Sequence, residues 1–218
     1  MGRPWLKICG LTNIPDLRCA QAAGADFLGV VIEAPSPRAV TVEVAARLAR
    51  LAPEKIVAVV VSRDESFLRR VIREVKPRAL QLHGPHAPEL VARFADKCPV
   101  WVAVSVPAAG SADGTSADRT LAIIGQAAVA GAELIVLDTA VGGQTGGTGQ
   151  VSDWALAAQI VAQSPLPVLL AGGLSPGNAA EALAQVKPAG LDASSRLERS
   201  PGRKDPRQVR ELGRVVKG

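Results

Sequence analysis

Eight short apolar runs alternate with eight longer segments of helical period along the chain, and this alternation constrains the fold more than any other feature. The runs are rich in Val, Ile, Leu and Ala and short enough to be buried strands, whereas the longer segments repeat their apolar residues at helical spacing. The expected strands are residues 6–9, 27–32, 55–61, 79–82, 100–104, 134–137, 168–171 and 191–193. The expected helices are residues 14–23, 42–51, 65–76, 88–96, 118–130, 153–162, 176–184 and 206–216.

Eight strand–helix pairs in 218 residues predict an α/β fold in which one parallel sheet closes into a (β/α)8 barrel. Barrels of this size commonly form one domain, and the longest loops, residues 107–117 and 139–152, show no domain boundary. We therefore expect residues 1–218 to be a single barrel domain. An open doubly wound sheet is the alternative arrangement.

The composition, 48% hydrophobic and 21% charged residues, is typical of a globular protein. No apolar stretch reaches the roughly 18 residues that span a bilayer, and the N-terminal residues lack the basic and apolar regions of a secretory signal. Three cysteines, Cys9, Cys19 and Cys98, are too few and too scattered for a disulfide framework. We therefore expect a cytoplasmic protein that has no membrane partner.

The net charge of +5 lies entirely in residues 196–218, which hold eight Arg or Lys residues against three Asp or Glu residues. A basic C-terminal helix could contact nucleic acid. However, its cations recur every three or four residues, which favours one solvated helix face, and aromatic residues for base stacking make up only 3% of the chain. We expect no nucleic-acid partner.

The residues able to carry chemistry follow the expected strands, where the active sites of barrels form. Cys9 ends the first strand and Asp138 follows the sixth. If these two strands are neighbours, a thiol and a carboxyl group face one cavity as an acid/base pair. His83, Arg38 and the glycine-rich loop 142–149 also follow strands.

Side-chain alternation along a strand places Lys7 inward if Cys9 points inward, two residues deeper in the barrel. A buried lysine needs a partner, and Asp192 on the last strand is the best candidate because closure brings that strand beside the first. In the alternative reading, Lys7 faces a helix and Cys9 is a small, inert core residue.

Two features predict where anions bind. Gly172-Gly173 after the seventh strand and Ser194-Ser195 after the eighth resemble the phosphate cradle that barrels form at these positions. Pro37 holds Ser36 extended and aims the Arg38 guanidinium toward the barrel mouth, where it can bind a carboxylate with two charge-assisted bonds. His83 and His86 lack a third ligand nearby, so no metal site is expected.

A series of motifs spanning nearly the whole chain resembles those of the phosphoribosylanthranilate isomerase family. The motifs are Lys7-Ile8-Cys9-Gly10-Leu11-Thr12, Ser36-Pro37-Arg38, Gln81-Leu82-His83-Gly84, Leu137-Asp138-Thr139, Gly146-Gly147-Thr148-Gly149, Asp153-Trp154, Ala171-Gly172-Gly173-Leu174, Leu191-Asp192-Ala193-Ser194-Ser195, Ser200-Pro201-Gly202 and Lys204-Asp205. The resemblance implies a TIM barrel that catalyses an Amadori rearrangement in tryptophan biosynthesis without cofactor or metal. It implies a small phosphosugar substrate, and relatives occur as monomers or homodimers.

On this resemblance Cys9 is the catalytic base, Asp138 the catalytic acid and Arg38 the ligand of the substrate carboxylate. The phosphate-binding residues would be Gly149, Gly172, Gly173, Ser194 and Ser195, and the other active-site residues would be Lys7, His83 and Asp192. A free thiol has a pKa of about 8.5 and is mostly protonated at neutral pH, whereas a base must be ionised. Lys7 below Cys9 could lower the pKa of the thiol. Asp138 must instead keep a proton, which partial burial favours.

The chain departs from the family pattern at three places. Arg196 stands where the family usually has the glycine of Ser-Ser-Gly, Ile32-Glu33-Ala34 lacks the usual aromatic or lysine, and Ser152 stands where the family usually has Phe. Two alternatives therefore stay open: another phosphosugar isomerase or a bifunctional isomerase on the same barrel, and a phosphate-binding barrel that has lost turnover.

Overall fold

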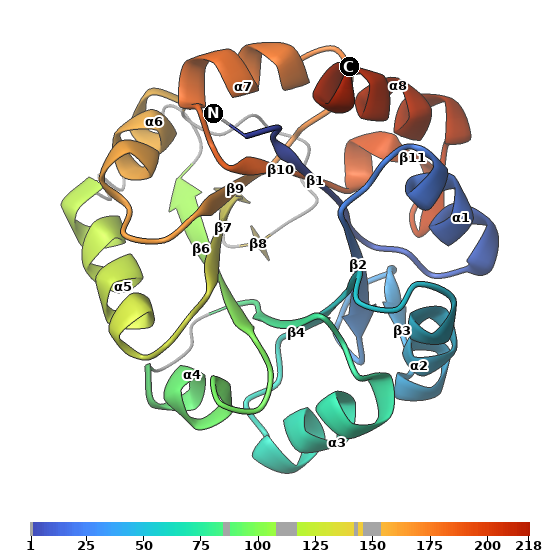
Figure 1. Ribbon diagram of the computed structural model, residues 1–218, viewed down its shortest axis with the longest axis horizontal. Coiled ribbons are helices and arrows are strands. Elements are labelled where there is room, and N and C mark those ends of the chain that lie inside the picture. Colours follow the sequence, from blue (N-terminus) through green and yellow to red (C-terminus); the bar gives the residue numbers. More distant parts are fainter. Residues whose placement is uncertain (1, 85–87, 108–116, 142–143, 146–153) are drawn as a thin grey trace.

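Eight parallel strands form a closed barrel in the structure, a computed structural model that describes residues 2–84, 88–107, 117–141, 144–145 and 154–218 (Figure 1). Around the barrel they run in the order β1, β2, β4, β5, β6, β7, β9 and β10, and β1 pairs with both β2 and β10. The predicted (β/α)8 barrel is confirmed, because closure of the sheet excludes the doubly wound alternative. These strands span Trp5–Ile8 (β1), Phe27–Ile32 (β2), Ile56–Val60 (β4), Ala79–Leu82 (β5), Val100–Pro107 (β6), Leu134–Val141 (β7), Val168–Ala171 (β9) and Gly190–Ala193 (β10).

The helices surround the barrel, and each predicted helix is present with its ends shifted by at most three residues (Figure 1). Several begin at a polar residue whose side chain accepts a hydrogen bond from the first turn, as Asn13, Thr41 and Asp205 do. Among the described residues, no helix is both long and apolar enough to cross a membrane. The helices are Ile14–Ala22 (α1), Val42–Leu51 (α2), Glu65–Val75 (α3), Pro88–Phe94 (α4), Ala117–Val129 (α5), Trp154–Gln163 (α6), Ala179–Val186 (α7) and Pro206–Lys217 (α8).

Five short elements are absent from the sequence prediction because two or three residues are too few to show a period. They are β3 (Ala39–Val40), β8 (Gln144–Thr145), the 3-10 helix Ser195–Leu197, β11 (Glu198–Ser200) and β12 (Arg203–Lys204). β11 and β12 pair antiparallel directly after the 3-10 helix. This small hairpin places Glu198 and Lys204 near the end of β10, where the sequence alone assigned them no role.

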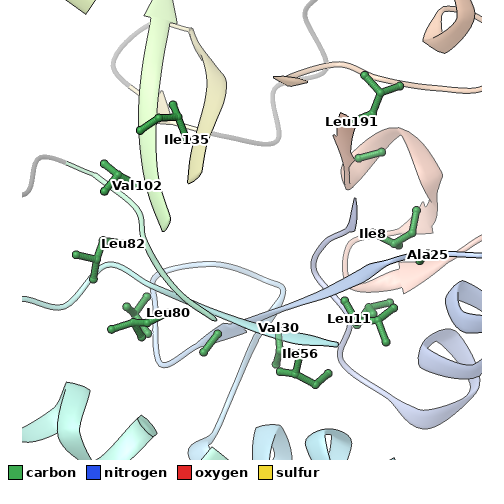
Figure 2. Packing of buried hydrophobic residues seen from close by; sticks show 14 of the residues in the cluster. Ile8, Leu11, Ala25, Val30, Ile56, Leu80, Leu82, Val102, Ile135 and Leu191 are labelled. Atoms are coloured by element: carbon green, nitrogen blue, oxygen red, sulfur yellow. The ribbon is translucent and has the colours of Figure 1, made fainter. Parts of the chain in front are cut away.

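Two apolar clusters hold the barrel, and strand alternation separates them. Outward-facing residues such as Ile8, Val30, Leu80 and Leu191 pack against the helices (Figure 2). Inward-facing residues fill the barrel and include Val57, Val59, Ala79, Trp101, Ala103, Leu134, Val136 and Leu169. These side chains fill the barrel beneath the cavity that opens at the carboxyl ends of the strands.

Three aromatic rings close the barrel where its strands begin. Phe27 packs edge-on against Trp5 and Trp101, with ring centroids 5.9 Å and 4.8 Å apart. The Trp101 indole donates a hydrogen bond to Glu133 at 2.9 Å, and Glu133 pairs with Arg78 at 3.0 Å. The indole N–H therefore has a partner although the ring is buried.

Candidate active site

A cavity of about 560 Å³ opens at the carboxyl ends of the barrel strands. Every predicted site residue that the structure describes lines it, except Lys7, which is buried beneath it. Gly149 lies outside the described residues. The lining residues from the prediction are Cys9, Arg38, His83, Asp138, Gly172, Gly173, Asp192, Ser194 and Ser195.

Cys9 follows β1 and reaches the cavity because a glycine on the next strand makes room for it. A Cβ atom on Gly29 of β2 would lie 2.7 Å from the Cys9 sulfur and 3.0 Å from its Cα. On the opposite side, the Cys9 amide donates to the Ala193 carbonyl of β10 at 2.9 Å. The thiol is thus held on the cavity floor between two strands and lines the cavity.

Lys7 forms the predicted ion pair with Asp192. The Lys7 ammonium lies 2.6 Å from the Asp192 carboxylate, and the two side chains are 0% and 8% exposed. They meet because Lys7 and Asp192 are direct partners in the register of β1 and β10. Burial alone lowers the pKa of Lys7, but Asp192 and Cys9 together outweigh burial and raise it, so Lys7 is charged.

The net pKa of Cys9 is raised, although Lys7 acts on it in the expected direction and lowers it. Burial of the thiol is the largest cause, and it outweighs the opposite effect of the nearby Lys7 and Lys204 cations. Asp192 weakens the influence of Lys7 further because its own charge raises the pKa of the thiol. Cys9 is therefore a protonated thiol at neutral pH.

Asp138 and His83 lie together on another part of the cavity wall. The His83 Nε2 atom is 3.8 Å from the Asp138 carboxylate, and the two side chains are 18% and 12% exposed. The condition that the strands of Asp138 and Cys9 are neighbours is not met, because β9 and β10 lie between β7 and β1, as the order of strands in a closed barrel requires. The two groups nevertheless share the cavity, because both point into the barrel mouth.

The loops after β9 and β10 carry the residues predicted to bind phosphate, and both loops line the cavity. Gly172 and Gly173 have φ angles of 97° and 63°, which side-chain-bearing residues rarely adopt. Ser195 begins the 3-10 helix next to them, while the Ser194 hydroxyl donates to the Cys9 carbonyl at 3.1 Å. Arg196 also lines the cavity, and its φ is not positive, so arginine fits there without backbone strain.

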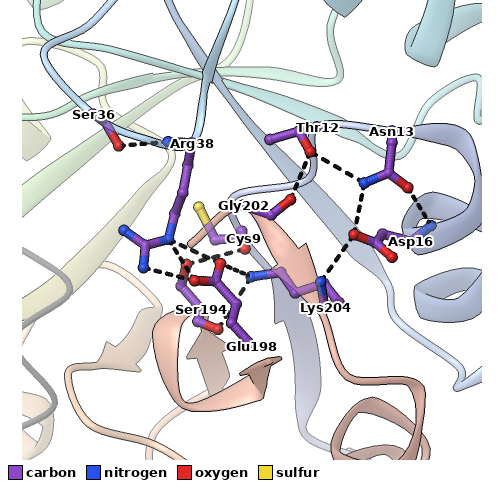
Figure 3. Close-up of polar contacts among 10 residues, drawn as sticks. All are labelled: Cys9, Thr12, Asn13, Asp16, Ser36, Arg38, Ser194, Glu198, Gly202 and Lys204. Atoms are coloured by element: carbon purple, nitrogen blue, oxygen red, sulfur yellow. Dashed lines mark hydrogen bonds and ion pairs between the residues drawn. The ribbon is translucent and has the colours of Figure 1, made fainter. Parts of the chain in front are cut away.

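Arg38 faces the cavity as predicted, but Glu198 already binds part of its guanidinium (Figure 3). The sequence alone assigned no role to Glu198, nor to two other residues at or near the cavity, Lys204 and Gln81. Lys204 is completely buried and contacts the Glu198 carboxylate at 2.8 Å. Gln81 is two residues before His83 on β5, so strand alternation from His83 could have placed it on the cavity wall.

Two buried oxygen atoms on this wall have no hydrogen-bond partner within the described part of the chain. They are Oε1 of Gln81 and Oδ1 of Asp192. Buried acceptors are almost always satisfied, so both are suited to accept hydrogen bonds from hydroxyl groups of a ligand or from water. Across residues 2–84, 88–107, 117–141, 144–145 and 154–218, no three His, Cys, Asp or Glu side chains are grouped as a metal would require.

The fold and the cavity define a class of protein: a (β/α)8 barrel with a cavity at the carboxyl ends of its strands, lined by a thiol, a carboxyl group and two guanidinium groups. Residues 6–214 match the family model of N-(5'-phosphoribosyl)anthranilate (PRA) isomerase. A protein of that name from Pseudomonas putida is 37% identical over 213 residues, covering 97% of this chain and 96% of its own. The chain belongs to the N-(5'-phosphoribosyl)anthranilate isomerase family and is an isomerase, which confirms the resemblance seen in its motifs.

Solved structures of similar proteins have the same fold. The phosphoribosyl anthranilate isomerase from Thermotoga maritima has a TM-score of 0.85 and 29% sequence identity, with 99% of both chains covered. The enzyme from Thermococcus kodakaraensis has a TM-score of 0.83 and 33% identity, again with 99% of both chains covered. A further isomerase structure, with a TM-score of 0.81 and 28% identity, is a complex with reduced 1-(o-carboxyphenylamino)-1-deoxyribulose 5-phosphate.

Replacing Lys7 by Met tests the ion pair with Asp192. The substitution leaves a buried carboxylate without its cation, so the free energy of unfolding should fall by about 3–5 kcal/mol in urea denaturation. The double variant Lys7→Met/Asp192→Leu removes both charges and should recover most of that loss. If Lys7→Met is as stable as wild type, the Asp192 carboxylate does not depend on Lys7 and is stabilised by water instead.

The pH dependence of thiol alkylation tests the pKa of Cys9. In a Cys19→Ser/Cys98→Ala background, only Cys9 can react with iodoacetamide, and the rate follows the thiolate fraction. Because the pKa is raised, the thiolate forms at higher pH than in a free thiol, and the midpoint should lie above about 8.5. A midpoint below that value would show that Lys7 and Lys204 outweigh burial.

Proposed function

We propose that Asp138 and Cys9 act as general acid and general base in the Amadori rearrangement of N-(5-phosphoribosyl)anthranilate. The product is 1-(2-carboxyphenylamino)-1-deoxyribulose 5-phosphate, and the reaction is a step of tryptophan biosynthesis. One observation carries the proposal: the thiol and the carboxyl group share a single cavity that also presents a guanidinium and a glycine-rich anion site.

The reaction needs one proton donor and one proton acceptor in sequence. Asp138 protonates the ribose ring oxygen, the C1–O bond breaks, and the nitrogen lone pair forms an iminium. The Cys9 thiolate then removes the proton from C2, which gives an enolamine that becomes the aminoketose. Hydrogen moves only within the substrate and through these two groups, so the step balances without an external oxidant or reductant.

The raised pKa of Cys9 fits this order of events. At neutral pH the thiol holds its proton, because burial disfavours the thiolate. Ring opening places a positive iminium beside the thiol and leaves Asp138 as a carboxylate, so the thiol passes its proton through water to Asp138 and becomes the thiolate. Lys7 and Lys204 favour the thiolate as well.

The two charged ends of the substrate fix its orientation across the mouth. Arg38 would bind the anthranilate carboxylate, and the backbone at Gly172, Gly173 and Ser195 would bind the phosphate. Gly149 would join the phosphate site from its own loop. Between these ends, the unpaired oxygens of Gln81 and Asp192 would accept hydrogen bonds from the sugar hydroxyls.

The free cysteines support a cytoplasmic location, and the small cavity supports a small-molecule substrate. Cys9, Cys19 and Cys98 are free thiols, as is usual in the cytoplasm, where we infer that the enzyme acts. Its partner is the small phosphosugar substrate, with no nucleic acid or membrane required. Both a monomer and a homodimer are compatible with this mechanism, because every proposed group comes from one chain.

Substituting the acid and the base tests the mechanism. Cys9→Ser and Asp138→Asn should each lower kcat by at least about 100-fold, since neither side chain can then exchange its proton usefully. Both variants should still bind reduced 1-(o-carboxyphenylamino)-1-deoxyribulose 5-phosphate. Turnover is followed by the loss of anthranilate fluorescence. Near-normal kcat in Cys9→Ser would rule out Cys9 as the base, and a pure rise in KM for Asp138→Asn would make Asp138 a binding residue only.

A second candidate function, a different or additional phosphosugar isomerisation, is favoured by Arg196, which lines the cavity where the family usually has glycine. If its guanidinium binds the substrate phosphate, Arg196→Gly should raise KM several-fold and make KM less sensitive to salt. Arg199→Gly is a matched control, because it removes the same charge from an exposed residue outside the cavity. A lower KM in Arg196→Gly would instead point to a redirected substrate preference.

A further inference from the structure

The guanidinium of Arg38 has two edges that can each bind a carboxylate, and Glu198 occupies one of them. Arg38 Nε donates to Glu198 Oε1 at 2.9 Å and Arg38 Nη2 donates to Oε2 at 2.7 Å (Figure 3). This is the lateral edge of the guanidinium. The end edge, formed by Nη1 and Nη2, is still able to bind a second planar anion with two hydrogen bonds.

Glu198 is itself fixed in place. Its side chain is only 4% exposed, and the Lys204 ammonium lies 2.8 Å from Oε1. Lys204 is completely buried and donates a second hydrogen bond to the Ser194 carbonyl at 3.1 Å. Because Glu198 and Lys204 are direct partners in the β11–β12 hairpin, this contact is built into the backbone register.

The stem of Arg38 is confined as well. It lies against Gly10, where a Cβ atom would come within 2.6 Å of the Arg38 Cδ atom. The Arg38 amide donates to the Ser36 hydroxyl at 3.2 Å, which fixes the loop that carries it. The stem and one edge of the guanidinium are therefore both held before any ligand enters.

The charges of the three groups leave the site attractive to an anion. Arg38 and Lys204 contribute two positive charges and Glu198 one negative charge, so the cluster has a net charge of +1. Without Lys204, the Arg38–Glu198 pair would be neutral, and its attraction for a carboxylate would be weaker. Lys204 thus allows the Glu198 carboxylate to hold Arg38 while the cluster keeps a net positive charge that attracts an anion.

We propose that Glu198 is a positioning residue that holds the Arg38 guanidinium so that its end edge binds the substrate carboxylate, while Lys204 preserves the net positive charge. The inference rests on the role of Arg38 in the proposed function. Because the Arg38 guanidinium is already fixed, substrate binding does not carry the entropy cost of ordering a long side chain. The opposite role, in which Glu198 competes with the substrate for Arg38, makes the opposite prediction.

Glu198→Gln separates the two roles, since it keeps the size of the side chain but removes the charge that holds Arg38. If Glu198 positions Arg38, KM for phosphoribosylanthranilate should rise about tenfold while kcat changes little. An analogue without the carboxylate should show the same KM with wild type and variant. Inhibition by inorganic phosphate, which the proposed function assigns to Gly172, Gly173 and Ser195, should not change. A lower KM for the normal substrate would identify Glu198 as a competitor and overturn the proposal.

Arg38→Ala distinguishes failure of this inference from failure of the proposed function. In the Arg38→Ala background, Glu198→Gln should have no further effect on KM, because the group that it positions is gone. If Arg38→Ala itself leaves the preference for the carboxylate intact, the proposed carboxylate site is wrong. If Arg38→Ala removes that preference but Glu198→Gln does not weaken it, only the positioning role is wrong.

Glu198→Asp keeps the proposal testable if Glu198→Gln does not fold. Aspartate retains the negative charge that Lys204 needs but is one methylene shorter, so it cannot reach the Arg38 fork in the same geometry. It should raise KM for the carboxylate-bearing substrate selectively, by a smaller factor. An equal rise for the substrate and the analogue would show a general disturbance of the hairpin and would contradict the proposal.

Discussion

The ion pair between Lys7 and Asp192 is the interaction on which the active site depends. It lies where the first and last strands close the barrel, and both groups are buried. An unpaired charge there would cost several kcal/mol, so each residue is tolerable only because closure supplies the other. The pair also forms the polar floor under Cys9, above an interior otherwise filled with apolar side chains. The same ion pair therefore joins the first and last strands of the barrel and sets the charge at the floor of the cavity.

Burial shifts the pKa values of the groups around this polar floor in opposite directions. It raises the pKa of Cys9 and lowers that of Lys204, in each case against neighbouring charges of opposite sign. The cavity therefore holds a thiol whose burial disfavours the thiolate and whose neighbouring lysines favour it. In the mechanism proposed above, positive charge on the substrate adds to the effect of the lysines.

The hairpin formed by β11 and β12 gives the barrel mouth a second fixed cluster. Through Glu198 and Lys204 it connects the end of β10 to Arg38, which follows β2 on the other side of β1. The Arg38 guanidinium is thus held by a buried pair of charges as well as by its own loop. Cys9, Arg38, Asp138 and the Gly172-Gly173 loop all line the cavity at the same face of one barrel.

The sequence by itself determined the repeating strand–helix pattern, because periods of two and 3.6 residues are local properties that each segment carries alone. It also placed Cys9, Asp138 and Gly172 at strand ends and correctly paired Lys7 with Asp192, since alternation and closure suffice for that pairing. Only the tertiary structure showed that burial outweighs Lys7 at the Cys9 thiol and that Glu198 holds Arg38. These two facts depend on distances and desolvation between residues far apart in the chain, which no local period encodes.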